Sequence, residues 1–167
     1  MFASEENRPT RRFDGLARLY ARCRPGYSDG AVTYIIGSPG GPVRLADVGC
    51  GTGISSRLFA RHGAEVVGVE PNAEMRAEAE ATPFEGPGAP PAYRDGRAEA
   101  TGLPDAWADV VAAAQAFHWF YPEAALREFR RVLKPGGTVA LLWNEPDMAD
   151  PTTAAYCAAL VESTPGT

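Results

Sequence analysis

The feature that most constrains the fold is a short apolar stretch, Val43–Val48, that runs directly into a glycine-rich turn. Gly49, Gly51 and Gly53 follow at alternate positions, and glycine allows both a tight turn and the close approach of a ligand to the backbone. A helical pattern, Ile54–Arg61, begins immediately afterwards. A buried strand that passes through a glycine turn into a helix predicts one unit of a parallel α/β sheet.

Short apolar segments alternate with helical patterns along the rest of the chain. Further strands are expected at Glu65–Val69, around Tyr93, at Asp109–Ala114 and at Thr138–Trp143. Further helices are expected at Phe13–Ala21, at Ser28–Ile36, after Asn72 as its cap, at Pro122–Leu133 and from Asp150 to about Glu162. Lys134–Gly137 would stop the helix Pro122–Leu133, with Gly136-Gly137 as a loop before the last strand. Nearly uncharged strands of this kind predict a parallel sheet covered on both faces.

Composition and charge exclude several other classes of protein. The chain has 167 residues, 45% of them apolar and 22% charged, which suits one folded domain and excludes wholesale disorder. Its net charge of −5 disfavours a nucleic-acid partner. The longest nearly uncharged stretch, residues 110–121, is too short to span a bilayer. Three widely separated cysteines and the absence of a secretory signal or a zinc spacing lead us to expect a cytoplasmic protein without a metal site.

Two carboxylates flank the glycine turn and indicate what it binds. Glu70 ends the second strand, where a carboxylate can accept hydrogen bonds from both hydroxyls of a ribose. Asp47 precedes the first glycine, where it would repel a pyrophosphate and attract an amine. The glycine spacing also differs from the dinucleotide fingerprint. This pattern predicts a ligand with adenosine at one end and an amino acid at the other, which is S-adenosylmethionine (SAM).

The chain resembles class I SAM-dependent methyltransferases, within the small-molecule, type 11 group that includes ubiquinone/menaquinone-biosynthesis and trans-aconitate methyltransferases. Five segments carry the resemblance: Asp47–Gly53, Gly68–Pro71, Gly96–Glu99 with Leu103-Pro104, Ala114–Phe120 and Arg130–Gly137. It implies a Rossmann-like doubly wound sheet, mostly parallel, with strand order 3-2-1-4-5 and without the last two strands usual in the superfamily. We expect residues 1–36 to form a helical cap and residues 37–167 the SAM-binding domain.

The resemblance also implies a set of cofactor-binding residues. Those expected near the methionine part of SAM are Asp47, Gly49, Cys50, Gly51, Gly53, Gln115 and Ala116. Those expected near the adenosine part are Glu70 on the ribose, and Pro71, Met75, Ala98 and Glu99 at the adenine. Tyr20 and Arg24 would close over the SAM carboxylate or the acceptor.

His118 is the candidate general base, for an acceptor that must lose a proton. It would border the acceptor pocket, but its aromatic neighbours equally suit a packed histidine, just as Gln115 equally suits a role at a strand end. Arg97 stands where many relatives carry an Asp that accepts from the adenine amino group. A guanidinium cannot accept a hydrogen bond, so Glu99 or a backbone carbonyl would have to replace that contact.

The predicted function is methyl transfer from SAM to a small-molecule acceptor, with S-adenosylhomocysteine (SAH) as product. The alternative is a SAM-binding domain or fragment without catalytic activity of its own. A nicotinamide-dependent oxidoreductase is disfavoured by the glycine spacing and by Asp47. We expect no nucleic-acid or membrane partner. The open edge of the last strand would be covered by the rest of a longer enzyme, by the last helix or by a second copy in a homodimer.

Overall fold

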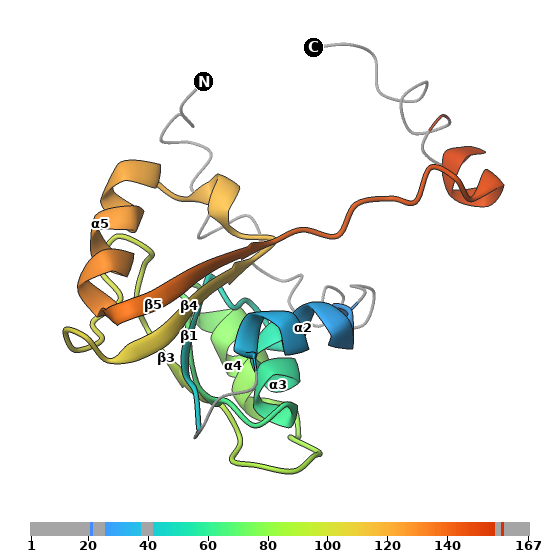
Figure 1. Ribbon diagram of the computed structural model, residues 1–167. Coiled ribbons are helices and arrows are strands. Elements are labelled where there is room, and N and C mark those ends of the chain that lie inside the picture. The colour runs from blue at the N-terminus through green and yellow to red at the C-terminus, as the bar shows by residue number, and fades with distance from the viewer. Residues whose placement is uncertain (1–20, 22–25, 38–41, 156–157, 159–167) are drawn as a thin grey trace.

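The computed structural model describes residues 21, 26–37, 42–155 and 158. Five strands form one sheet in the order β3-β2-β1-β4-β5 (Figure 1), and each neighbouring pair is parallel. The strands are β1 Arg44–Val48, β2 Glu65–Val69, β3 Ala92–Arg94, β4 Ala108–Ala114 and β5 Leu133–Leu142. The predicted Rossmann-like α/β fold and strand order are confirmed.

Helices cover both faces of the sheet. They are α2 Asp29–Ile36, α3 Ile54–Arg61, α4 Ala73–Ala81 and α5 Pro122–Val132, with a single turn of 3-10 helix, η2, at Phe117–Trp119. In Figure 1, α2, α3 and α4 lie on one side of the sheet and α5 lies on the other. Because all crossings of a parallel sheet run over its faces, this arrangement leaves the carboxyl ends of the strands clear for a site.

Each face of the sheet has its own apolar cluster. Phe59 of α3 is 1% exposed and packs in the cluster that contains Leu45, whereas Phe129 of α5 is fully buried in the cluster that contains Val48. Successive side chains of a strand point to opposite faces, so β1 contributes to both clusters. This two-sided burial explains why β1, after exposed Arg44 at its start, contains no polar residue besides Asp47.

Helix boundaries follow their local signals. The side chain of Asn72 accepts a hydrogen bond from the Met75 N–H at 3.0 Å and caps α4, as predicted. Gly63, with φ 92°, turns the chain after α3, and its N–H donates to the Ala60 carbonyl. Asp150 caps a helical stretch at residues 151–155 by accepting from the Thr153 N–H at 2.7 Å. The expected end of that helix near Glu162 lies outside the described residues.

Helix α5 ends at Val132, before the predicted stop Lys134–Gly137, but the prediction that Gly136-Gly137 is a loop before the last strand was wrong, because β5 already begins at Leu133. Pairing along β4 steps from Ala108 with Leu133 to Val110 with Thr138, so Lys134–Gly137 form a bulge inside β5. The Lys134 ammonium bonds both carboxylate oxygens of Asp109, at 2.8 and 2.9 Å. This pair holds the bulge against the start of β4, which the sequence pattern alone did not indicate.

The predicted N-terminal cap is described only in part. Helix α2 matches the expected helix at Ser28–Ile36, and Val32 joins the same apolar cluster as Phe59. The Asp29 carboxylate also meets the His62 ring at 2.8 Å, which ties α2 to the end of α3. Apart from Ala21, the expected helix at Phe13–Ala21 lies outside the described residues. The domain boundary after residue 36 therefore stays a prediction.

Candidate functional site at the carboxyl edge of the sheet

The carboxyl ends of β1, β2 and β4 bring the predicted site residues to one edge of the sheet. The glycine loop 49–53 follows β1, Glu70 follows β2, and Gln115 follows β4. Strand order reverses between β1 and β4 because the chain first builds β2 and β3 on one side and then β4 and β5 on the other. In open α/β sheets, ligands bind at such a switch point.

Close packing around the loop explains its first and last glycines. A Cβ on Gly49 would lie 2.7 Å from the Ala116 Cβ, and one on Gly53 would lie 2.8 Å from the Tyr93 ring. Gly51 has more space, but its φ of 54° is left-handed, as are those of Gly49 and Gly53 at 71° and 75°. The loop can therefore take this path only with glycine at these positions.

Asp47 lies beneath the glycine loop and does not reach the open side of the edge. It is fully buried, and its Oδ2 accepts hydrogen bonds from Ser55 at 2.7 Å and Ser56 at 2.6 Å. Burial raises the pKa of Asp47, and these two hydroxyls oppose that rise. Its Oδ1 is buried without a partner among the described residues. A carboxylate held there acts on a ligand through the loop, and it suits an amine better than a phosphate.

Glu70 binds the glycine loop directly. Its Oε2 accepts from the Gly51 N–H at 2.9 Å, and its Oε1 accepts from the Asn72 N–H at 2.9 Å. Burial raises the pKa of Glu70, whereas these backbone hydrogen bonds lower it. Each carboxylate oxygen can accept more than one hydrogen bond. The two N–H groups therefore orient the carboxylate and leave it able to accept from a diol.

Pro71 follows Glu70 directly, and Met75 lies in the first turn of α4; their predicted contact with the adenine stays a prediction. Met75 is 3% exposed, and its Cε is the nearest group to a Cβ built on Gly51, at 3.7 Å. Pro71 is half-buried between Glu70 and the start of α4. Met75 therefore packs under the glycine loop, and Pro71 is the more exposed of the two apolar residues next to Glu70.

Ala98 and Glu99 belong to a tight turn after β3. The backbone of Arg97 and Ala100 closes this turn with two hydrogen bonds of 3.2 and 3.0 Å. Ala98 is buried, whereas the Glu99 carboxylate accepts from the Tyr121 N–H at 2.9 Å. Because that oxygen already accepts from α5, Glu99 ties the turn to the start of the helix. The Arg97 side chain is exposed.

Gln115 follows β4 in a left-handed conformation, with φ 56°, which is uncommon for a residue with a side chain. Its N–H donates to the Leu142 carbonyl at 2.8 Å, and its side-chain amide donates to the Asn144 carbonyl at 3.1 Å. The strand-end role that the sequence left open is thus present, and the next residue, Ala116, packs against Gly49.

The aromatic segment after Ala116 forms the rim of this edge. His118 is exposed on η2, and its ring centroid lies 4.7 Å from that of Trp119. The Phe120 ring approaches the glycine loop, 3.1 Å from a Cβ built on Gly49. Cys50, in contrast, is buried, and burial raises the pKa of its thiol well above the ordinary value. A protonated thiol of this kind is a packing group and not a nucleophile.

Several contributing residues were missed by sequence reasoning. Ser55 and Ser56 hold Asp47, and a pair of serines at the start of a helix was the signal that could have indicated them. Tyr93 was seen only as a strand residue, yet it fills the space beneath Gly53 and lines a shallow cavity of about 280 Å³ behind the loop. Tyr20 and Arg24 lie outside the described residues.

Among the described residues, no group of three or more His, Cys, Asp or Glu side chains is placed to hold a metal ion. Nor does any described helix combine the length and apolar character needed to cross a membrane.

Fold and site define a Rossmann-like domain with a glycine loop and two buried carboxylates at its carboxyl edge. A family profile described as "Methyltransferase domain" matches residues 46–141. An uncharacterized methyltransferase of Mycobacterium tuberculosis is 35% identical over 139 residues, which are 81% of this chain and 53% of that protein. Another, from Schizosaccharomyces pombe, is 36% identical over 123 residues, which are 73% of this chain and 47% of that protein. This chain belongs to the methyltransferase domain family, the type 11 class I methyltransferases.

Solved structures agree with this family. An S-adenosylmethionine dependent methyltransferase from Mesorhizobium loti is 27% identical, with a TM-score of 0.56 over 77% of this chain and 54% of that one. The [4+2]-cyclase SpnF is 31% identical, with a TM-score of 0.60 over 68% of this chain and 42% of that one. The chain spans about half the length of the curated relatives it matches, at 53% and 47%.

Proposed function

We propose that this chain binds SAM at the carboxyl edge of its sheet and transfers the methyl group to a small-molecule acceptor. One observation carries the proposal: Glu70 accepts from the Gly51 N–H inside the left-handed glycine loop, and buried Asp47, just before the loop, accepts from Ser55 just after it. The loop leads into the N-terminus of α3, whose N–H groups favour a carboxylate such as that of an amino acid.

The buried polar groups fit the adenosine and amino-acid ends of such a ligand. Glu70 would accept from the ribose hydroxyls, because its carboxylate is already oriented by Gly51 and Asn72. Met75 and Pro71 would contact the adenine. The unpartnered Oδ1 of Asp47 places negative charge below the loop, where it would attract the ligand amine. A pyrophosphate would meet repulsion at the same point.

Bound SAM would supply a methyl group on a positively charged sulfur, which is already activated for transfer. The residues of this chain then mainly have to hold the acceptor close to that carbon and in line with it. An acceptor that must lose a proton needs a base, and exposed His118 at the rim of the edge is the candidate. An acceptor that is already a carboxylate needs none.

A SAM-binding domain without catalysis of its own is the second candidate function. The chain spans about half the length of its curated relatives, 53% and 47%, and acceptor sites depend on the whole protein. Relatives with this fold also include a structure named as a [4+2]-cyclase, and a fold does not by itself fix the chemistry. Release of SAH in a screen of acceptors would separate the two functions.

Calorimetric titration with SAM and SAH tests the proposal. We expect micromolar binding by the wild-type chain and at least a tenfold loss in Glu70→Gln, because an amide cannot accept from both hydroxyls of a diol. Glu65→Gln is the matched control, since Glu65 lies exposed at the other end of the same strand. A folded wild-type chain that binds neither compound would contradict the proposal.

A further inference from the structure

We propose that Glu128 of α5 is a positioning residue that fixes the turn Arg97–Ala100 on the base-binding side of the site. The proposal rests on the proposed function, because it concerns how the site reads a purine. It identifies a residue in the middle of a helix, remote from the glycine loop in the sequence, as one that sets ligand discrimination.

The turn follows β3, the strand whose last residue is hydrogen-bonded to Glu70. The Glu70 N–H donates to the Arg94 carbonyl at 3.1 Å, where the chain leaves β3. Two residues later, a Cβ on Gly96 would lie 2.8 Å from the Val69 side chain. Glu70 therefore contacts the glycine loop on its β1 side and the end of β3 on the other, and the base of a nucleoside held by Glu70 would have this turn within reach on the β3 side.

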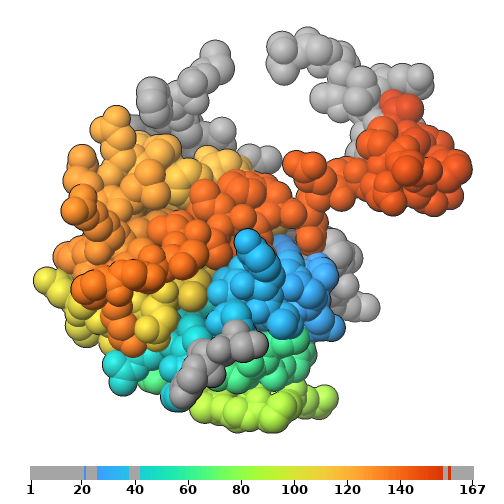
Figure 2. Space-filling view, in the orientation of Figure 1, coloured from blue at the N-terminus to red at the C-terminus, as the bar shows by residue number. Residues whose placement is uncertain are grey.

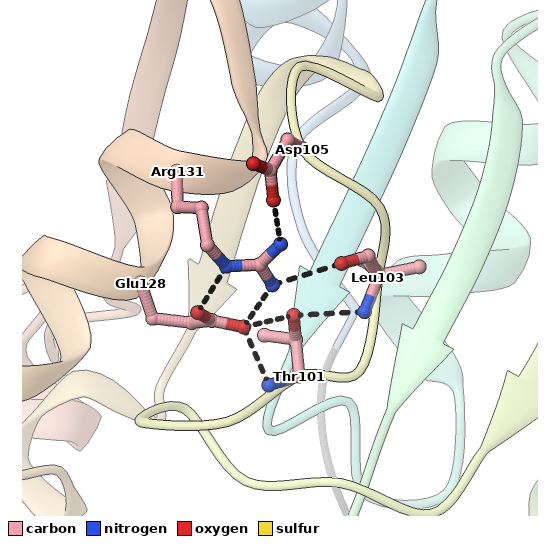
Figure 3. Close-up of polar contacts among 5 residues, drawn as sticks. All are labelled: Thr101, Leu103, Asp105, Glu128 and Arg131. Carbon is pink, nitrogen blue, oxygen red and sulfur yellow. Dashed lines mark hydrogen bonds and ion pairs between the residues drawn. The ribbon is translucent and has the colours of Figure 1, made fainter.

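Glu128 holds the residue that directly follows the turn. The Oε1 of Glu128 accepts from the Thr101 N–H at 2.8 Å and from the Thr101 hydroxyl at 2.6 Å (Figure 3). Thr101 is 1% exposed, and its hydroxyl also accepts from the Leu103 N–H at 3.2 Å. Both the backbone and the side chain of Thr101 are therefore fixed by a single carboxylate.

Arg131 prevents that carboxylate from turning away. Its Nε donates to Oε2 of Glu128 at 2.8 Å and one terminal nitrogen donates to Oε1 at 2.7 Å. The same guanidinium bonds the Leu103 carbonyl at 2.8 Å and pairs with Asp105, as Figure 3 shows. A paired, planar arrangement of this kind fixes geometry as well as charge. The hydrogen bond from Arg131 lowers the pKa of Glu128 to about 2.

Helix α5 holds the turn at a second point. The Tyr121 N–H, at the start of the helix, donates to the Glu99 carboxylate inside the turn. Tyr121 follows Phe120, whose ring approaches Gly49. The segment that enters α5 thus contacts the turn through Tyr121 and the glycine loop through Phe120, while Glu128 in the helix holds the residue after the turn.

The positioning role of Glu128 can be measured by how well the site distinguishes adenine from a closely related purine. We would determine the Kd of SAH and of S-inosylhomocysteine, which differs only at the edge of the base, and take the ratio of the two. In Glu128→Gln and Thr101→Val we expect SAH to bind three- to tenfold more weakly and the ratio to fall toward one. Thr101→Ser keeps the hydroxyl and should restore the wild-type ratio. Glu123→Gln, an exposed change on the same helix, is the control.

A purely structural role would give a different result. Loss of stability lowers the folded fraction and weakens both ligands by one common factor, so an unchanged ratio in folded Glu128→Gln and Thr101→Val overturns the proposal. We call the hydrogen bonds from Thr101 to Glu128 the Glu128 clamp. Hydrogen exchange at residues 97–101 without ligand tests this clamp independently of SAM binding. If the wild-type chain binds no SAH, the proposed function fails. Faster exchange in Glu128→Gln would still support the clamp, and unchanged exchange would overturn it.

Discussion

The side-chain amide of Gln115 donates to the backbone carbonyl of Asn144 at 3.1 Å, which fastens the residue after β4 to the chain leaving β5. The Asn144 side chain in turn donates to the Gly26 carbonyl at 3.0 Å. Two hydrogen bonds therefore connect the segment before α2, the end of β5 and the corner of β4. That corner carries Ala116, which packs on Gly49.

Replacement of Gln115 should separate its hydrogen bond from its backbone strain. Gln115→Ala loses the bond to Asn144 and keeps the left-handed φ of 56°, so we expect a loss of about 0.5–1.5 kcal/mol in the free energy of unfolding. Gln115→Gly loses the same bond but relieves the strain. It should be at least as stable as the alanine variant in urea unfolding. A glycine variant clearly less stable than the alanine variant would refute this interpretation.

Gly49→Ala should combine backbone strain with a steric overlap. The new Cβ would lie 2.7 Å from the Ala116 Cβ, so we expect about 2–4 kcal/mol of destabilisation and weaker SAH binding. Gly63→Ala is the control, because its φ of 92° is also positive but nothing lies within 4 Å of the added atom. The free energy of unfolding of Gly63→Ala should fall by only about 1–2 kcal/mol, and this variant should bind SAH as the wild type does. Equal losses of stability in Gly49→Ala and Gly63→Ala would argue against a steric overlap with Ala116.

The Glu128 clamp should make stability depend on pH in the acid range. Arg131 lowers the pKa of Glu128 from 4.5 to about 2 in the folded state. A carboxyl with a lowered pKa supplies its stability above the ordinary value and loses it as pH falls toward the folded value. We expect the free energy of unfolding of the wild type to exceed that of Glu128→Gln by about 1–3 kcal/mol at pH 7. The difference should shrink between pH 4.5 and 2, as urea unfolding at several pH values would show; a constant difference would exclude this linkage.

We propose that the edge of β5, which pairs with no other strand among the described residues, supports self-association. Figure 2 shows β5 at the surface, where Leu141 is 39% exposed, and Trp143, just after the strand, is 45% exposed. Leu141→Lys should shift any concentration-dependent dimer to monomer in sedimentation experiments, since charge on an edge strand opposes pairing. Tyr34→Lys, which removes an exposed aromatic residue from α2, should leave association unchanged. Wild-type chains that stay monomeric at high concentration would rule out the dimer.

The strands and helices were predictable because they depend on local patterns, whereas the strand order was expected from the resemblance to class I methyltransferases. The apolar strand Glu65–Val69 and the helix that follows Asn72 each depend on a few neighbouring residues, and the structure confirms both. The bulge at Lys134–Gly137 was not predictable in the same way. Its conformation depends on the Asp109 carboxylate, which the sheet brings close only after folding.

The candidate site was predictable in its residue types and less so in its contacts. The glycine loop and Glu70 are adjacent in space, as their positions after β1 and β2 implied. The burial of Asp47 under the loop was not foreseen, because it depends on which face of β1 carries the side chain. The contribution of Glu128 depends on where α5 packs, and no local signal carries that information.

The pairing of β1 with both β2 and β4 has a consequence for how the molecule assembles. Leu45 pairs with nearby Val66 but also with Val110, much later in the chain. Loop closure makes the later pairing the slower one, so the glycine loop and Glu70 can come together before the corner at Gln115 has formed. A ligand that needs both would bind only the completed sheet. It would therefore slow unfolding without helping the earliest steps of folding, and its affinity would report that the last strands are in place.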